Sequence, residues 1–141
     1  MKNIIIFSFV SIIALVSQSF KQTNPATTSL KNGKQAYETY CQSCHMEDGQ
    51  GVPGAFPTLV KAGNLNDKNR LVKIILQGMR GSITTKGVKY DAEMTGIDMS
   101  EKETADLINY IRNTWGNKAP MIGVADVATA KKAVVKGYQP Y

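Results

Sequence analysis

The sequence predicts an all-α domain, and three observations support that fold class. Apolar residues recur at helical spacing in several segments, and the clearest of them follows a capping box formed by Ser100 and Glu103. A Gly- and Pro-rich stretch over 47–63 is typical of an irregular loop. Alternation of apolar and polar residues is weak and is confined to a small hairpin over 82–90. We therefore expect three to four main helices and little sheet.

Apolar periodicity, caps and glycines place the individual helices. The first helix leads directly into a cysteine, and the second begins at Asn66 or Asp67, either of which can cap it. The third carries an apolar face that includes Trp115 and is expected to end at Gly116. A short fourth helix is expected near the C-terminus. These predicted helices run over 30–40, 66–78, 101–115 and 126–135.

The N-terminal residues are typical of a secretory signal peptide. Lys2 precedes an apolar run over 4–16, and small residues at 17–19 suit cleavage after Ser19. The run is shorter than the ~18 residues of a membrane span, so we expect 1–19 to be a cleaved signal, with an uncleaved anchor as the alternative.

Composition divides the rest of the chain into a linker, one domain and a tail. The 141 residues have room for one domain, and two cysteines are too few for a disulfide-stapled scaffold. The formal charge is +6, with 17 Lys+Arg against 11 Asp+Glu, which is too mild and too poorly interleaved with aromatic residues to indicate nucleic-acid binding. The predicted parts are a flexible linker over 20–30, the folded domain over 31–117 and a C-terminal extension over 118–141.

The most informative motif is C-x-x-C-H over 41–45, the attachment sequence for a c-type haem. Two thiols one helical turn apart, Cys41 and Cys44, can each form a thioether with a porphyrin vinyl group. His45 is then held beneath the iron as an axial ligand. Every cysteine and histidine of the chain lies in this motif. The sequence therefore predicts one covalently bound haem c.

Three other kinds of site can contain a C-x-x-C-H motif, but each fits this sequence less well. A Cys41–Cys44 disulfide would close a very small loop and stabilise little. A thiol–disulfide exchange motif would be expected next to a strand in a βαβ unit, which the pattern around 41–45 does not supply. A zinc site would need further Cys or His ligands downstream.

The second axial position has several candidates. Because His45 is the one histidine, bis-histidine ligation is excluded, and a Met, Lys or Tyr ligand or an open position remains. Met46 adjoins His45 on the proximal side, and Met79 and Met99 suit core positions at helix boundaries. The methionines after the signal segment are Met46, Met79, Met94, Met99 and Met121.

The sequence resembles the class I cytochromes c over about 31–117. The first helix carries the family's Gly and aromatic at Gly33 and Tyr37, and Pro57-Thr58-Leu59 matches its P-x-L segment. The block over 94–112 resembles the family's Met-to-last-helix segment. The last-helix pattern is matched by Leu107, Ile108, Tyr110 and Ile111.

The resemblance implies how each matched residue serves the haem. Met94 would be the second axial ligand, and the Pro57 carbonyl would accept a hydrogen bond from His45 Nδ1. Leu59 would pack on the porphyrin. The full set of expected haem-binding residues is Cys41, Cys44, His45, Pro57, Leu59, Tyr90, Met94 and Leu107.

The expected function is electron transfer rather than enzymatic catalysis. The loop over 48–59 and the ending Trp115-Gly116-Asn117 resemble cytochrome subunits of periplasmic dehydrogenases and nitrite reductases. We expect exported or membrane redox partners, a dehydrogenase as donor and a reductase or oxidase as acceptor, with acidic surfaces attracted to basic residues near the haem, Lys61, Lys86 and Lys89. A haem protein with an open or labile distal site and a C-x-x-C thiol oxidoreductase remain as alternatives.

Overall fold

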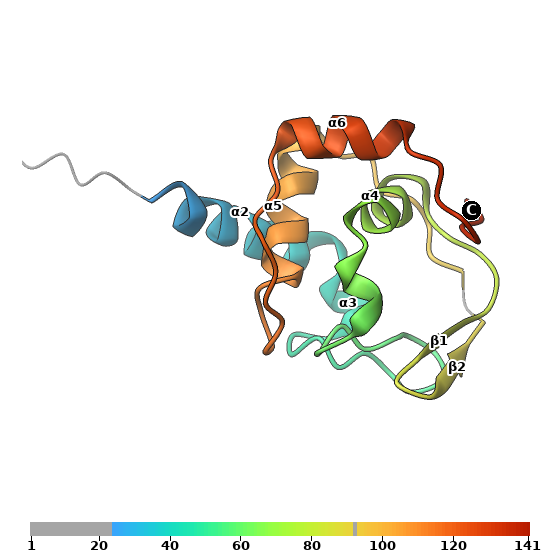
Figure 1. Ribbon diagram of the computed structural model, residues 1–141. Helices are drawn as coiled ribbons and strands as arrows, with labels where there is room; N and C mark the ends of the chain where they lie inside the picture. The colour runs from blue at the N-terminus through green and yellow to red at the C-terminus, as the bar shows by residue number, and fades with distance from the viewer. Residues whose placement is uncertain (1–23, 92) are drawn as a thin grey trace, which may run out of the picture.

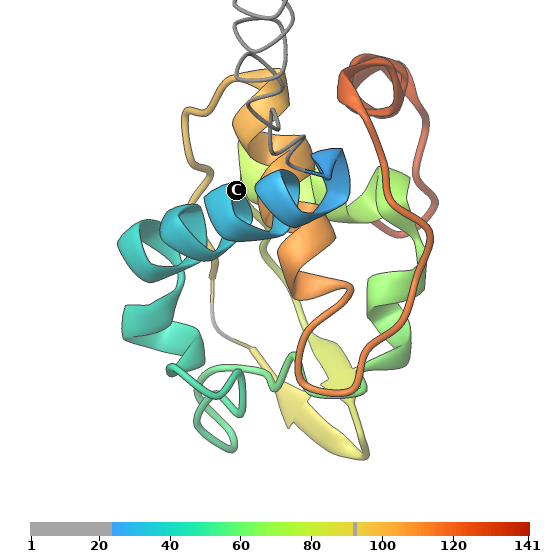
Figure 2. The same cartoon turned by 90° about the vertical axis from the view of Figure 1, so that its left-hand side faces the viewer.

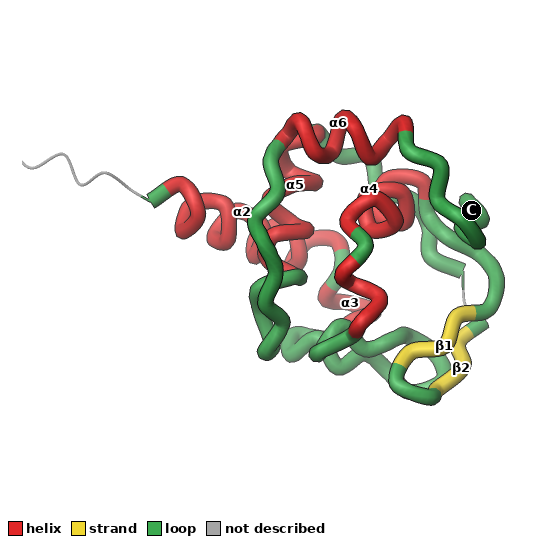
Figure 3. The backbone as a smooth tube through the Cα atoms, viewed as in Figure 1, coloured by secondary structure: helices red, strands yellow, loops and turns green. Residues whose placement is uncertain are grey.

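The computed structural model describes residues 24–91 and 93–141. The predicted signal peptide over 1–19 and the first residues of the predicted linker lie outside this part of the chain. The all-α prediction is confirmed, because helices joined by loops make up most of the described chain and one two-stranded hairpin is the sheet within it (Figure 3). In order, the elements are α2 (Pro25–Tyr40), α3 (Gln42–His45), η1 (Gly63–Asn66), α4 (Lys68–Gln77), β1 (Ile83–Thr85), β2 (Val88–Tyr90), α5 (Glu101–Ile111) and α6 (Val124–Lys132).

Helices α2 and α5 cross and form the most extensive helix–helix contact (Figure 2). At the crossing, Gly33 lies so close to α5 that a β-carbon there would overlap the Asp106 carbonyl oxygen. Tyr37, one turn further along α2, is 1% exposed and packs against Tyr110 with ring centroids 5.6 Å apart. The absence of a side chain at residue 33 therefore allows the two helix backbones to approach and bury the aromatic residues beside it.

Helix α2 begins at Pro25, so the predicted linker over 20–30 is wrong from that residue onward. Asn24 caps the helix by accepting a hydrogen bond from the Ala26 amide at 2.9 Å, and proline is well suited to the first helical position. Ser29 also donates to Asp106 on α5 at 2.6 Å. The polar residues of this segment cap the start of α2 and contact α5. A flexible linker has a similar polar composition, so composition alone does not distinguish the two.

Helix α5 has the predicted capping box at Ser100 and Glu103, but it ends at Ile111 rather than at Gly116. Asn117 Nδ2 donates to the Ile111 carbonyl at 2.9 Å, and Trp115 adopts a left-handed backbone with φ of 53°. The turn after α5 brings the indole against Tyr37, with centroids 4.9 Å apart. Trp115 therefore belongs to the aromatic cluster beside the helix and not to the helix itself.

The second helix and the hairpin lie where the sequence predicts them. Asp67 caps α4 by accepting hydrogen bonds from the amides of residues 69 and 70, and Gly78 ends it. Strands β1 and β2 pair antiparallel around Lys86 and Gly87, with Ile83 opposite Tyr90. The hairpin is held at one edge of the domain, beside the loop that contains Met94 (Figure 1).

The C-terminal extension packs on the domain. Helix α6 spans Val124–Lys132 instead of the predicted 126–135 and lies along α4 (Figure 1). Its Val127 and Ala130 are fully buried. Before α6, the buried Asn109 side chain of α5 exchanges two hydrogen bonds with the Ile122 backbone, at 2.8 and 2.9 Å. The apolar pattern over 124–135 is too short to define the ends of α6. We infer that contacts with the rest of the domain, such as this one, determine where α6 begins.

None of the helices in the described part of the chain is both long enough and apolar enough to cross a membrane.

Candidate functional site

The two cysteines lie where α2 gives way to the short helix α3. Cys41 ends α2 and precedes α3, and both Cys44 and His45 donate their amides to the Cys41 carbonyl, at 3.2 and 2.9 Å. This single turn places the two sulfurs on the same side of the chain, and both cysteines line one cavity as free thiols. Burial, together with a smaller effect of the neighbouring Cys44, raises the pKa of the Cys41 thiol to about 12. Cys41 is therefore a protonated thiol at neutral pH.

His45 presents a neutral imidazole to the same cavity. Its Nδ1 lies 2.9 Å from the Pro57 carbonyl oxygen, and because a carbonyl can only accept, Nδ1 carries the proton. Nε2 is then left with a free lone pair. Burial lowers the pKa of His45, and the hydrogen bond to Pro57 offsets only part of that shift. An oriented, unprotonated imidazole of this kind is a metal ligand.

The cavity brings together seven of the eight predicted site residues. It has a volume of about 220 Å³ and lies among α3, the loop that follows it, α4, the hairpin and the loop before α5. The predicted residues that line it are Cys41, Cys44, His45, Pro57, Leu59, Tyr90 and Met94. Leu107 does not line it: this side chain is fully buried in the core on α5. The helical pattern that places Leu107 on the apolar face of α5 cannot tell core packing from contact with a ligand.

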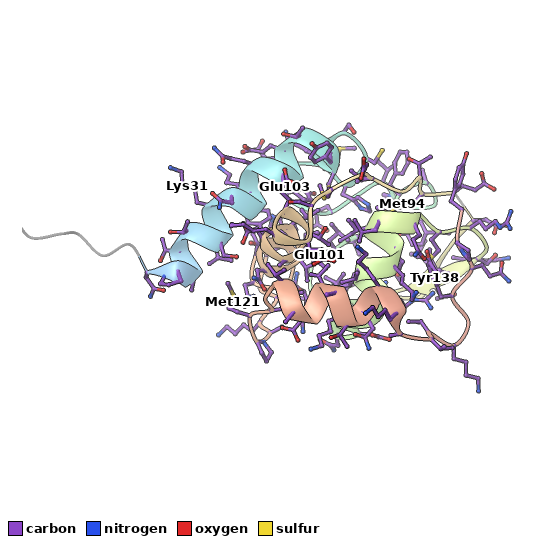
Figure 4. The ribbon with its side chains drawn as sticks, turned by 90° about the horizontal axis from the view of Figure 1, so that it is seen from above. Lys31, Met94, Glu101, Glu103, Met121 and Tyr138 are labelled. Atoms are coloured by element: carbon purple, nitrogen blue, oxygen red, sulfur yellow. The ribbon has the colours of Figure 1, made fainter. Side chains whose placement is uncertain are left out.

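Met94 reaches the cavity from the loop between the hairpin and α5. Its backbone forms an isolated antiparallel bridge with Met79, in which each amide donates to the other's carbonyl, at 2.8 and 2.7 Å. Met94 is partly exposed, whereas Met79 is 6% exposed. In Figure 4, Met94 lies near α4, on the side of the molecule away from Lys31 and Met121.

Several cavity residues were not identified from the sequence as site residues. Met79 suits the core, as expected, but it also lines the cavity. Most of the other side chains of this wall are apolar residues that a periodicity argument assigns only to a core. They are Phe56, Leu65, Leu71, Ile74, Ile83 and Ile97. The sequence predicts the hairpin and the apolar faces of the helices. Neither prediction indicates that these side chains line the same cavity.

A larger hollow of about 310 Å³ between α2 and α5 lacks this chemistry. Its walls contain no cysteine, histidine or methionine. They consist of Asn32, Gln35, Ala36, Thr39, Tyr40, Lys102, Glu103 and Asp106. Volume alone therefore does not identify the site, whereas the donor set of the smaller cavity does.

The residues around the smaller cavity fit a haem. Two thiols and a neutral imidazole come from one turn of chain, apolar side chains form the walls, and thioether sulfurs lie in the loops beyond. These are the groups that attach a porphyrin covalently and ligate its iron. The helical fold and this site together define a c-type haem protein.

Comparison with known proteins agrees with that class. The family model for cytochrome c matches residues 30–115, more than half of the chain, and the chain belongs to the cytochrome c family. The cytochrome c domain and the similarity to a cytochrome c-552 identify the chain as an electron carrier. The covalent haem c that the family implies accounts for the C-x-x-C-H motif.

Similar proteins include a cytochrome c-552 and cytochrome c subunits of dehydrogenases. A cytochrome c-552 from Thermus thermophilus is 34% identical over 109 residues, which cover 72% of this chain and 71% of that protein. The cytochrome c subunit of a quinone alcohol dehydrogenase from Gluconobacter oxydans is 34% identical over 70% of this chain and 23% of the subunit. The gluconate 2-dehydrogenase cytochrome c subunit of Pantoea cypripedii is 32% identical over 72% of this chain and 24% of the subunit. The chain thus spans about a quarter of the length of these dehydrogenase subunits.

Proposed function

We propose that the chain binds one haem c through thioethers to Cys41 and Cys44, with His45 and Met94 as the axial ligands, and shuttles single electrons between exported redox proteins. The observation that carries this proposal is the shared cavity. Attachment and ligand residues from 41–45 line it together with Met94, which is separated from them by most of the domain in sequence.

The bound haem iron would supply one-electron redox chemistry, and the residues of the chain set the conditions for it. Pro57 holds the imidazole of His45 in one orientation and one tautomer. The thioether of Met94 favours the ferrous form and so raises the reduction potential. The apolar walls keep the cavity at low dielectric, which also tunes the potential. No acid, base or nucleophile is needed for this function.

Two exposed lysines of the hairpin support an electrostatic contribution to docking. Lys86 in the turn and Lys89 on β2 are both exposed, and the two strands of the hairpin supply Ile83 and Tyr90 to the cavity. Lys61 is exposed on the loop after Leu59. Positive charge around the cavity would attract acidic surfaces of a dehydrogenase donor and of a reductase or oxidase acceptor. The names of the similar dehydrogenase subunits favour a donor of that class.

We further propose that the chain is exported and that its signal is cleaved after Ser19. The apolar run over 4–16 and the small residues that follow it support this proposal. N-terminal sequencing of the protein matured in a bacterial host tests it: a new terminus at Phe20 is the expected result, and an intact Met1 would indicate an uncleaved anchor.

The alternative of a thiol oxidoreductase is weakened by the state of Cys41. A reactive C-x-x-C cysteine needs a lowered thiol pKa, whereas burial raises the pKa of Cys41 to about 12. The alternative of an open distal site depends on how firmly Met94 holds the iron. Met94 lies in a loop, and the spectrum of the haem-loaded protein distinguishes a firmly bound Met94 from an open or labile distal site.

The experiment is an optical titration of the protein matured in a host that attaches c-type haem. Covalent haem together with the weak long-wavelength band of an iron–methionine sulfur bond is expected. Met94→Ala should lose that band, bind carbon monoxide in the ferrous form and lower the potential by on the order of 0.1 V. Met121→Ala is the matched control, because Met121 is 39% exposed and does not line the cavity.

Each other outcome points to a named alternative. Covalent haem without the sulfur band, or a band that survives in Met94→Ala, would remove Met94 from the proposal and favour an open or differently ligated site. A protein that acquires no covalent haem in such a host would contradict the whole proposal and leave the thiol chemistry of Cys41 and Cys44.

A further inference from the structure

The last residues of the chain return to the segment that carries Met79. Tyr138 is partly buried, and its hydroxyl lies 2.6 Å from the carbonyl oxygen of Gly78, the residue that caps the C-terminus of α4, and 3.0 Å from the carbonyl oxygen of Lys73 in the second half of α4. A phenol has one proton to donate, so the shorter contact to Gly78 is the stronger hydrogen bond. Figure 4 shows Tyr138 at the same end of α4 as Met94.

Two backbone hydrogen bonds extend this contact to either side of Gly78. The Tyr141 amide donates to the Gln77 carbonyl at 3.3 Å, and the Arg80 amide donates to the Gln139 carbonyl at 3.2 Å. The tail therefore forms hydrogen bonds with three residues of this segment, Gln77, Gly78 and Arg80.

Gly78 is also where the tail and the Met94 loop meet. Its φ of 70° is accessible to glycine at little cost. A β-carbon at this position would overlap the Met94 carbonyl oxygen and would lie 2.6 Å from Cβ of Tyr141. The backbone at Gly78 is thus packed between the tail and the Met94 loop. A shift of this backbone would also shift Met79, the residue that pairs with Met94.

The Met94 loop has few other backbone anchors. Within the described part of the chain, three backbone hydrogen bonds join 93–99 to the rest of the domain: the pair with Met79, and one from the Ile97 amide to the Ile75 carbonyl at 2.8 Å. Two of the three therefore depend on the position of Met79, the residue directly after Gly78.

We propose that Tyr138 is a positioning residue for Met94. By holding the Gly78 carbonyl, it keeps Met79 in the bridge that presents Met94 to the cavity, and so it lowers the rate and extent of ligand release from ferric iron. The role rests on the proposed function, because it requires Met94 to be an iron ligand. The family model ends at residue 115, so Tyr138 lies outside the matched part of the chain, whereas Gly78, Met79 and Met94 lie within it.

The test compares Tyr138→Phe with Tyr141→Phe in the haem-loaded, full-length protein. The first substitution removes the hydroxyl that bonds Gly78 and keeps the ring. The second removes the hydroxyl of a tyrosine that is 59% exposed. Imidazole is titrated into the ferric protein while the iron–sulfur band is followed. Amide hydrogen exchange is measured at Met79 and Met94, and thermal unfolding is measured in parallel.

Tyr138→Phe is expected to tighten apparent imidazole binding about two- to tenfold, the factor that corresponds to one neutral hydrogen bond. Exchange at the Met79 and Met94 amides should accelerate by a similar factor, and the reduction potential should fall. Tyr141→Phe should match the wild type in imidazole affinity, in amide exchange and in reduction potential, which is measured for all three proteins.

Three results would overturn the proposal. One is a Tyr138→Phe protein with wild-type imidazole affinity and exchange, even if its unfolding temperature falls, because the tail would then only stabilise the fold. Another is an equal effect of both variants. A wild-type protein without the iron–sulfur band would refute the proposed Met94 ligation itself and the positioning role with it, whereas a normal wild-type band with unaltered variants would refute the positioning role alone.

Discussion

Asp106 on α5 forms polar contacts with two residues of α2, Ser29 and Asn32. It is 7% exposed, and its carboxylate accepts hydrogen bonds from Ser29 at 2.6 Å, Lys102 at 2.7 Å and Asn32 at 3.2 Å. Burial by itself raises the pKa of this carboxyl, but the three hydrogen bonds and the positive charge of Lys102 together outweigh burial, and the net pKa is lowered. The charged form of Asp106 is therefore the form that stabilises the helix crossing.

We predict that Asp106→Asn lowers the free energy of unfolding at pH 7 by about 1–3 kcal/mol, the cost of disturbing hydrogen bonds to a buried charge. Because the pKa is lower in the folded state, the stability due to ionised Asp106 is present above its ordinary value of 3.8 and is lost as the pH falls through the folded value. The difference from wild type should therefore shrink below about pH 3.8.

Urea unfolding of the haem-loaded protein at neutral and acid pH measures this difference. Glu38→Gln is the control, because Glu38 pairs with Lys34 on the exposed face of α2, where an ion pair contributes little. A deficit in Asp106→Asn that stays constant across the acid range would show that the ionised carboxylate is not the stabilising form.

At the scale of elements, the start of α5 is set locally by its capping box. Ser100 Oγ accepts from the Glu103 amide at 3.2 Å, and the Glu103 carboxylate accepts from the Ser100 amide at 3.1 Å. Figure 4 shows Glu101 and Glu103 at this end of α5. Two acidic residues in the first turn also complement the helix dipole. The loop that holds Met94 leads directly into this cap.

We predict that Ser100→Ala lowers the free energy of unfolding by about 1 kcal/mol, which corresponds to roughly 4 °C in the melting temperature for a domain of this size. Ser100→Thr keeps a hydroxyl cap and should melt near the wild-type temperature. Thermal unfolding followed by far-ultraviolet circular dichroism makes the comparison. Equal losses in both variants would mean that the cap hydroxyl does not stabilise α5.

At the scale of the whole molecule, the net positive charge and its distribution over the surface affect how fast charged reactants associate with the protein. The formal charge is +6. Some lysines are joined to acidic residues, including Lys68 to Asp126 and Lys131 to Glu101 at 3.1 Å, and these pairs also connect α6 with α4 and α5. The exposed hairpin lysines beside the cavity are expected to contribute to the field that an approaching reactant meets.

We predict that oxidation of the ferrous protein by anionic hexacyanoferrate(III) slows as ionic strength rises, while oxidation by cationic tris(1,10-phenanthroline)cobalt(III) does not slow, because salt screens attraction and repulsion alike. The combined Lys86→Glu and Lys89→Glu variant should lower the low-salt rate with the anion about tenfold. Stopped-flow mixing measures both rates.

Lys31→Glu is the control for this experiment. Lys31 is exposed near the N-terminal end of α2, and Figure 4 places it on the opposite side of the molecule from Met94. If Lys31→Glu slows the anion as much as the hairpin variant does, net charge alone accounts for the effect. A basic surface near the cavity would then be unnecessary.

The sequence by itself determined the features that depend on neighbours within one or two turns of chain. The C-x-x-C-H spacing, the capping box at Ser100, the Asp67 cap and the Lys86-Gly87 hairpin all involve groups only a few residues apart. The geometry of these features follows from the local backbone conformation, so the spacing of residue types in the sequence is sufficient to predict them.

Only the tertiary structure decided which distant side chains share one space. Leu107 and Met79 both fit an apolar pattern, yet the first is enclosed in the core and the second lines the cavity. Helix α2 begins at Pro25, and its first turns include Ser29, which donates a hydrogen bond to α5. Helix α5 ends before the predicted residue, and the turn that follows it brings Trp115 against Tyr37. Tyr138 reaches Gly78 across most of the second half of the chain. Such contacts depend on packing between segments far apart in sequence, and local periodicity carries no record of that packing.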